Sequence, residues 1–312
     1  MAIDPHAKRF LDKLAALAPA SMLSLSVGER RTGLEQLLKF SKRPACIGQV
    51  EDRTLPGPGG PLTARIYTPA GAEPAKVLPG LVFFHGGGLC AGNLDTHDGI
   101  CRALANASGC RLISIDYRLA PEHPFPAAIA DGCAAGGWAA AHAEPLHLDP
   151  ERLVIGGDSA GATLAAAVCH MTTTAGTVRW SLQFLLCPIM DFKADTESRR
   201  AFAQGYLLDQ ATLEHDLKHY LSGGVDPADP RISPLRAARL EDLPPACIHT
   251  AEFDPLRDEG RAYAEQLERA GVKTLYRCHS GMIHLFYGMG SLIPYATAAY
   301  ELMGADIRAM LP

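Results

Sequence analysis

Two segments at the start of the chain carry apolar residues three or four positions apart, with polar residues between them. The apolar positions are Phe10, Leu11, Leu14 and Leu17 in residues 6–18, and Val27, Leu34, Leu37, Leu38 and Phe40 in residues 27–40. This spacing predicts two amphipathic helices that precede any strand. They could cover an ordinary core, or they could lie over one edge of a later sheet as part of a lid.

Further along, the pattern changes to short apolar runs. Residues 50–55 and 62–67 alternate on either side of a turn rich in glycine and proline, which predicts an antiparallel hairpin. The strands predicted after it are 81–84, 111–116, 152–156, 182–186, 246–250 and 274–278, and the helices are 94–108, 127–142, 159–173, 256–270 and 292–310. Such alternation predicts an α/β fold with a mainly parallel central sheet, helices on both faces and the hairpin at one edge.

The alternation stops between residues 188 and 245, where 207–221 is an isolated helical pattern between polar and Pro/Gly-rich stretches. An insertion at this point could form the second part of a lid. The predicted organisation is an N-terminal helical cap segment at 1–48, a first part of the core at 49–187, a cap insertion at 188–244 and a second part of the core at 245–312.

Composition narrows the class of protein. The chain has 312 residues, 47% of them hydrophobic and 20% charged, with a formal net charge of −5. These values are ordinary for a globular protein, and without a basic run they give no reason to expect nucleic-acid binding. No apolar run is long enough to span a bilayer, and the N-terminus lacks a signal-peptide pattern. The nine cysteines form no Cys-x-x-Cys pair, so we expect free thiols and no metal site. We also expect no cofactor and a cytoplasmic location.

The chemistry centres on Ser159. A buried strand runs through Gly157-Asp158-Ser159-Ala160-Gly161 into an alanine-rich helix, which is the strand–turn–helix setting of a nucleophile elbow. The turn strains the serine backbone, and glycines on both sides remove clashes with the neighbouring strand and helix. The alternative is that small residues merely pack where a helix crosses a strand.

Three consecutive glycines, Gly86, Gly87 and Gly88, follow His85 directly after the strand 81–84. Glycine is costly in backbone entropy, so such a run indicates that backbone must closely approach another group. In acyl transfer that group is the oxyanion, which amide N–H groups can stabilise. A flexible turn is the alternative.

A serine nucleophile needs a base and an orienting carboxylate. Asp254 and His284 each follow a predicted strand, in the chain order serine, acid, histidine that this elbow uses. All three could therefore meet at one edge of the sheet. Asp254 could instead cap the helix that follows it, and His284 could simply end a strand. A dinucleotide site is excluded because the G-x-G-x-x-G spacing is absent.

Together these segments closely resemble the hormone-sensitive lipase-like group of α/β-hydrolases, the bacterial family IV esterases. The matching pieces are residues 85–88, 94–98, 116–128, 157–161, 254–258 and the segment around His284. The resemblance covers the chain from about residue 50 to the C-terminus. It implies an α/β-hydrolase fold with a helical cap built from the N-terminal helices and the insertion.

By position, the resemblance implies Ser159 as nucleophile, His284 as base and Asp254 as its orienter. It implies an oxyanion hole from Gly87, Gly88 and the N–H of Ala160, with Gly86 shaping the turn. Candidate residues of the substrate pocket are Leu89, where relatives often carry an aromatic residue, together with Asp158, Tyr206 and Leu207.

The function expected is a serine carboxylesterase acting on small, short- to medium-chain esters through an acyl-enzyme, without cofactor, nucleic-acid partner or membrane insertion. Relatives are often dimers, so a homodimer is a possible assembly. Two alternatives stay open. One is a small-molecule-binding module without catalysis on the same fold, and the other is an amidase or acyltransferase that uses the same triad.

Overall fold

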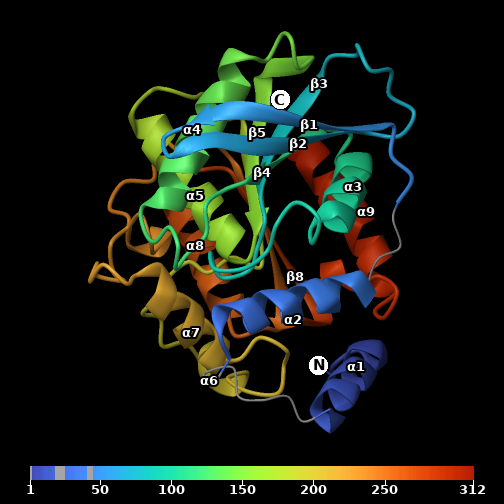
Figure 1. The fold of residues 1–312 in the computed structure, drawn as a ribbon, viewed down its shortest axis with the longest axis vertical. Coiled ribbons are helices and arrows are strands. Elements are labelled where there is room, and N and C mark those ends of the chain that lie inside the picture. The colour runs from blue at the N-terminus through green and yellow to red at the C-terminus, as the bar shows by residue number, and fades with distance from the viewer. Residues whose placement is uncertain (1, 18–24, 41–44) are drawn as a thin grey trace.

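The computed structural model of the protein describes residues 2–17, 25–40 and 45–312 (Figure 1). In this part of the chain, eight strands form one sheet in the order β1-β2-β4-β3-β5-β6-β7-β8. The strands are β1 (Gln49–Gly57), β2 (Gly60–Thr68), β3 (Leu78–Phe84), β4 (Arg111–Asp116), β5 (Leu148–Asp158), β6 (Leu182–Leu186), β7 (Ala246–Phe253) and β8 (Thr274–Ile283).

Most of the sheet is parallel, as the alternation of strands and helices predicts. Neighbouring strands from β4 to β8 pair in parallel, whereas β2 pairs antiparallel with both β1 and β4. The β1–β2 hairpin therefore forms one edge of the sheet, which confirms the position predicted for it. Central strands are apolar on both faces because helices cover both; every residue of β6, for example, is buried.

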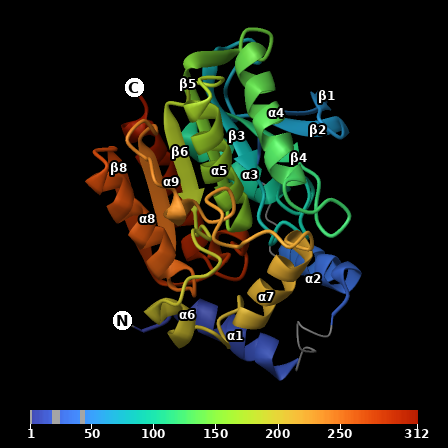
Figure 2. The same cartoon turned by 90° about the vertical axis from the view of Figure 1, so that its left-hand side faces the viewer.

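Helices pack on the two faces of the sheet (Figures 1 and 2). One face is covered by α4 (Ala127–Ala141), α5 (Ala160–Thr174) and α8 (Arg257–Arg269), and the other by α3 (Asp98–Ser108) and α9 (Tyr295–Met310). Each layer has its own apolar core. The predicted α/β class with helices on both faces is confirmed. None of the helices in the described ranges has the length and apolar character that crossing a bilayer requires.

A third group of helices lies together at the lower end of the molecule in both views (Figures 1 and 2). It consists of α1 (Pro5–Ala16), α2 (Val27–Phe40), α6 (Glu197–Ala201) and α7 (Gln210–Tyr220). The predicted helix over 207–221 starts later than expected, because the side chain of Asp209 caps α7 by accepting the N–H of Thr212 at 2.8 Å. The short helix α6 has no counterpart in the sequence-based prediction, and the proposed domain limits stay predictions.

These helices are tied to the rest of the molecule by arginine side chains. From α2, Arg31 donates to the backbone oxygens of Cys90 (2.8 Å) and Ala120 (3.1 Å) and pairs with Glu122 at 2.6 Å. From α6, Arg199 pairs at 2.5 Å with the fully buried carboxylate of Glu259 on α8. Charged contacts of this kind fix α2 against the loops that follow β3 and β4, and α6 against α8.

Candidate active site

Ser159 lies at the sharp turn between β5 and α5, with φ 53° and ψ −125°. A non-glycine residue rarely adopts a positive φ, and such strain persists only where the surrounding structure enforces it. A Cβ on Gly161 would overlap the backbone oxygens of Phe84 and His85, and one on Gly157 would lie 2.6 Å from the oxygen of Phe84. The two glycines therefore have the steric role that the motif predicts.

The structure brings Ser159, His284 and Asp254 together. His284 follows β8 and Asp254 follows β7, so each side chain leaves the same edge of the sheet as Ser159. Nδ1 of His284 lies 2.7 Å from Oδ2 of Asp254, and its Nε2 lies 3.1 Å from Oγ of Ser159. With its proton on Nδ1, the imidazole donates to the carboxylate and accepts from the serine hydroxyl. This is the arrangement of a serine nucleophile, a base and an orienting acid.

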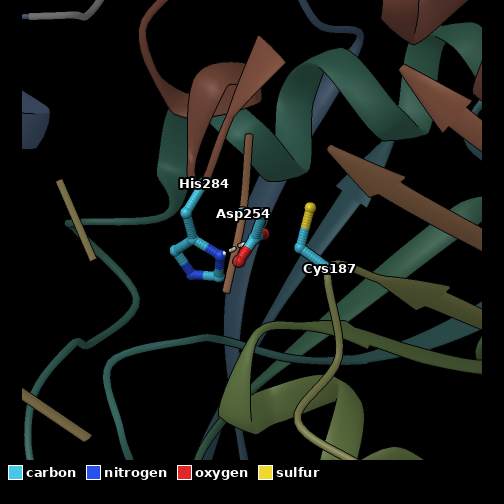
Figure 3. Close-up of side chains that lie close together, drawn as sticks. All are labelled: Cys187, Asp254 and His284. Atoms are coloured by element: carbon cyan, nitrogen blue, oxygen red, sulfur yellow. Dashed lines mark hydrogen bonds and ion pairs between the residues drawn. The ribbon is translucent and has the colours of Figure 1, made fainter. Parts of the chain in front are cut away.

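Asp254 fulfils both roles that the sequence left open. Its Oδ2 faces His284, as Figure 3 shows, while its Oδ1 accepts the N–H of Leu256 at 2.9 Å just before α8 begins. The side chain is fully buried. Because both carboxylate oxygens are occupied, the group has little freedom to turn away from the imidazole.

Cys187 directly follows β6, and its side chain lies beside the same carboxylate (Figure 3). Burial, followed by the charge of Asp254, raises the pKa of this thiol well above its usual range. Candidate ligand atoms of Cys187, Asp254 and His284 lie within 4.8 Å of one another. A metal ion would need the thiolate and would displace the hydrogen bond between His284 and Asp254. The donors present therefore fit a hydrogen-bonded triad better than a metal centre.

Residues 86–88, which we call the glycine loop, lie beside Ser159 on the cavity wall. Within the described residues, the amide N–H groups of Gly87, Gly88 and Ala160 have no hydrogen-bond partner. The N–H of Gly86 donates instead to Oδ1 of Asp158 at 2.9 Å, so it is not available to a ligand. Three amide donors are thus free for an oxyanion, while Gly86 anchors the loop.

Asp158 connects the glycine loop to two further elements. Besides Gly86, it accepts the hydroxyl hydrogen of Tyr287 at 3.0 Å, and Nε2 of His97 lies 3.5 Å away. Burial opposes its ionisation, but His97 and these hydrogen bonds outweigh that effect and lower the pKa of Asp158. Nothing in the sequence pattern predicts that His97 and Tyr287 meet this carboxylate, because they come from distant segments without a shared motif.

A cavity of about 530 Å³ opens in front of Ser159 and His284, a size typical of small-molecule sites. Its walls come from the glycine loop, α1, α2 and the segment from Gly205 to α7, and many of the lining residues are leucines. The pocket residues predicted from the sequence are partly wrong. Asp158 and Leu207 line the cavity, but Leu89 is buried in the core, 2% exposed. Tyr206 stacks on Phe253 outside the lining, at 5.9 Å between ring centroids.

Physical reasons explain both errors. Leu89 adopts a positive φ of 62° directly after the glycine loop, which turns its side chain into the core. Tyr206 belongs to an aromatic group with Phe202 and Phe253, and this packing holds its ring away from the cavity. In contrast, Leu11 and Leu14 of α1, and Leu34 and Leu37 of α2, line the cavity with the apolar faces seen in the sequence.

Comparison with known proteins agrees with this geometry. A family model described as the alpha/beta hydrolase fold matches residues 81–288. The chain belongs to the α/β-hydrolase family. The matched region contains all three residues of the triad, so the resemblance inferred from the motifs is confirmed, as is the α/β-hydrolase fold.

This α/β-hydrolase is similar to proteins named as ester hydrolases. It is 42% identical over 287 residues to "Carboxylic ester hydrolase LipN" of Mycobacterium tuberculosis, a match covering 90% of this chain and 76% of the relative. It is 34% identical over 305 residues to "Ethyl acetate hydrolase" of Pseudomonas putida, covering 95% of each protein.

Solved structures of esterases superpose closely on this α/β-hydrolase. An ester hydrolase from the metagenome of Lake Arreo, in complex with a bipyridine phosphonate derivative, has a TM-score of 0.94 at 39% identity and covers 98% of both chains. The hyperthermophilic esterase of Pyrobaculum calidifontis has a TM-score of 0.92 at 36% identity over 99% of both. Both likenesses extend over the lower helices as well as the sheet.

Proposed function

We propose that the protein is a serine carboxylesterase of the hormone-sensitive lipase-like group, hydrolysing small esters through an acyl-enzyme. One observation carries this proposal: the hydrogen-bonded series Ser159–His284–Asp254 ends at an apolar cavity, beside amide N–H groups that have no partner in the described part of the chain. The relatives, which include proteins named as carboxylic ester hydrolases and esterases, support the same reaction class.

Each step of the reaction uses a group in this site. Nε2 of His284 takes the hydroxyl proton as Oγ of Ser159 attacks the ester carbonyl. Asp254 stabilises the imidazolium that forms. The negative charge on the carbonyl oxygen is held by the N–H groups of Gly87, Gly88 and Ala160. His284 then protonates the leaving alcohol, and a water molecule repeats the sequence on the acyl-enzyme.

The cavity supports a preference for short to medium acyl chains. About 530 Å³ is shared between the acyl and alcohol parts of an ester, and most of the wall is aliphatic. A long fatty chain would exceed this space, whereas a short chain would bury all its apolar surface.

The activity is tested with p-nitrophenyl esters from acetate to palmitate, together with a fluorophosphonate that labels reactive serines. We expect labelling of Ser159 and a maximum of kcat/KM at a short or medium chain. A folded sample that is neither labelled nor active would indicate a binding module instead. Matched anilides, and assays with an added alcohol, would show whether amide hydrolysis or acyl transfer dominates.

We also propose that α1, α2, α6 and α7 form the cap over the site, since each helix or its flanking segment borders the cavity or packs beside it. All nine cysteines are free thiols, which supports a reducing, cytoplasmic environment. A homodimer stays a prediction, and light scattering of the purified protein tests it.

A further inference from the structure

A buried ion pair between two cap helices lies against the glycine loop. Nη2 of Arg30, on α2, lies 3.1 Å from Oδ2 of Asp216, on α7. The exposed fractions of the two side chains are 12% and 6%. We propose that Arg30 neutralises Asp216 so that negative charge can develop on the substrate at the adjacent oxyanion hole. This inference rests on the proposed ester hydrolysis.

The carboxylate of Asp216 lies unusually close to the glycine loop. A Cβ placed on Gly88 would overlap the Oδ2 atom of Asp216 and would lie 2.6 Å from the Cβ of Asp216. The Asp216 side chain therefore occupies the space that any side chain at position 88 would fill. The backbone of the same residue is also held there, because its oxygen accepts from Sγ of Cys90 at 3.3 Å. A full negative charge is thus fixed next to an amide that we expect to bind the oxyanion.

Such a charge opposes the reaction unless it is paired. Two negative charges repel strongly in a partly buried site, where the effective dielectric constant is well below that of water. The hole works by lowering the energy of the oxyanion, so an unpaired carboxylate beside it would cancel part of that stabilisation. The guanidinium of Arg30 supplies the compensating charge on the cavity side.

Arg30 carries the permanent positive charge of the described cavity wall. Among the described lining residues it is the only lysine or arginine, whereas the carboxylates there are Glu29, Asp158, Asp209 and Asp216. Its Nε is buried without a hydrogen-bond partner in the described part of the chain. The positive charge of Arg30 therefore acts on the carboxylate of Asp216.

His215 is the other neighbour of Asp216, with Nδ1 at 3.0 Å from Oδ1 and Nε2 at 3.2 Å from the oxygen of Leu25. The guanidinium of Arg30 stays charged at every pH of an esterase assay. Arg30 is thus the permanent counter-charge of Asp216.

A charge cycle tests the proposal with Arg30→Gln, Asp216→Asn and the double variant, all measured at pH 8. Arg30→Gln leaves the carboxylate unpaired, so we expect kcat to fall about tenfold or more. Asp216→Asn removes the repulsive charge, so kcat should stay within about threefold of wild type. The double variant should regain the activity that Arg30→Gln loses. The matched control is Glu122→Gln. It removes the carboxylate that pairs with Arg31, the neighbour of Arg30 on α2, and should keep wild-type kcat.

An inhibitor that forms an oxyanion gives a second measurement. Oγ of Ser159 adds to the carbonyl carbon of a trifluoromethyl ketone, its proton passes to His284, and the carbonyl oxygen becomes the oxyanion. The inhibition constant should rise in Arg30→Gln by about the factor by which kcat/KM falls. The matching methyl ketone, which binds mainly as the neutral carbonyl, should change little.

Several results would overturn the inference. Unchanged kcat in Arg30→Gln would do so, as would a double variant as slow as Arg30→Gln, because the pair would then act only through packing. If the melting temperature shows that Arg30→Gln is unfolded, a tenfold loss of kcat in Asp216→Asn would overturn the inference. Failure of a fluorophosphonate to label the wild-type protein would instead refute the proposed function itself.

Discussion

The carboxylate of Asp254 and the imidazole of His284 lie 2.7 Å apart, both buried and both just beyond the ends of neighbouring strands. Because the second carboxylate oxygen accepts the N–H of Leu256, rotation of Asp254 would break a hydrogen bond at the start of α8. The acid that orients the base is thereby fixed by the secondary structure that follows it. Such a fixed partner holds the proton on Nδ1 and leaves Nε2 free to accept from Ser159.

Asp254→Asn tests this role directly. The amide cannot stabilise an imidazolium and can favour the wrong tautomer, so kcat should fall about 10³- to 10⁴-fold. The measurement is p-nitrophenyl butyrate turnover, with circular dichroism to verify the fold. Asp258→Asn, an acid in the first turn of α8 outside the triad, is the control and should remain active. Equal losses in both variants would argue against a specific role for Asp254.

Ser159→Ala should lower ester turnover by at least about 10⁴-fold, because the variant lacks the hydroxyl that Nε2 of His284 contacts at 3.1 Å. The melting temperature should change little, since alanine keeps the Cβ and backbone of Ser159 and opens no large void. Fluorophosphonate labelling should disappear in parallel. Turnover at the wild-type rate would contradict the proposed mechanism.

Cys187 should resist alkylation in the folded protein. Burial, and then the charge of Asp254, raise the pKa of its thiol, so it stays protonated and unreactive at neutral pH. Cys46 and Cys278 are exposed and should react with iodoacetamide first. Peptide mass spectrometry before and after denaturation checks this, because unfolding should make Cys187 as reactive as the others. Labelling of native Cys187 as fast as that of Cys46 would show that the thiol is accessible.

Gly33 on α2 offers a way to shorten the cavity. It lines the wall, and nothing lies within 4 Å of a Cβ built on it. Gly33→Leu should reduce kcat/KM for octanoate relative to acetate by at least about fivefold, because the new side chain fills acyl space. Leucine also has the better helix propensity, by up to about 1 kcal/mol, so stability should not fall. Gly137→Leu on α4 is the matched control, since its Cβ is equally unobstructed and lies away from the cavity.

His279 should make the fold sensitive to acid. Burial, and then Arg277, lower the pKa of His279 from 6.5 to about 4. The unfolded chain therefore binds this proton more readily, and stability present above pH 6.5 is lost as the pH falls toward 4. One such group changes the free energy of unfolding by about 1.4 kcal/mol per pH unit within that window. Urea titrations between pH 4 and 6.5 measure this. The free energy of unfolding of His279→Gln should change less with pH than that of the wild type, whereas His142→Gln, at an exposed helix end, should behave like the wild type.

Much of the active site could be predicted because its chemistry depends on local sequence. The turn at Ser159 requires glycine at 157 and 161 for steric reasons, and these constraints appear within five consecutive residues. Asp254 and His284 could be placed because the carboxyl ends of parallel strands meet at one edge of a sheet. The hairpin of β1 and β2 was equally clear from its turn residues.

The errors concern contacts between distant segments. Leu89 directly follows the glycine loop, but a positive φ turns it into the core, and no sequence pattern specifies that rotation. Tyr206 is drawn aside by Phe202 and Phe253, which lie on different elements. The short helix α6 was missed because its few residues give no periodic signal, although a buried ion pair with Glu259 holds it in place.

The links of Asp158 to Gly86, Tyr287 and His97 have a consequence for how this enzyme could diversify. One carboxylate couples the nucleophile turn, the glycine loop and the segment after His284, so we expect these parts to be inherited as a unit. The helices that border the cavity are less restricted, provided that the pair of Arg30 on α2 and Asp216 on α7 is exchanged as one. Exchanging them between homologues should therefore transplant selectivity while leaving the reaction itself intact.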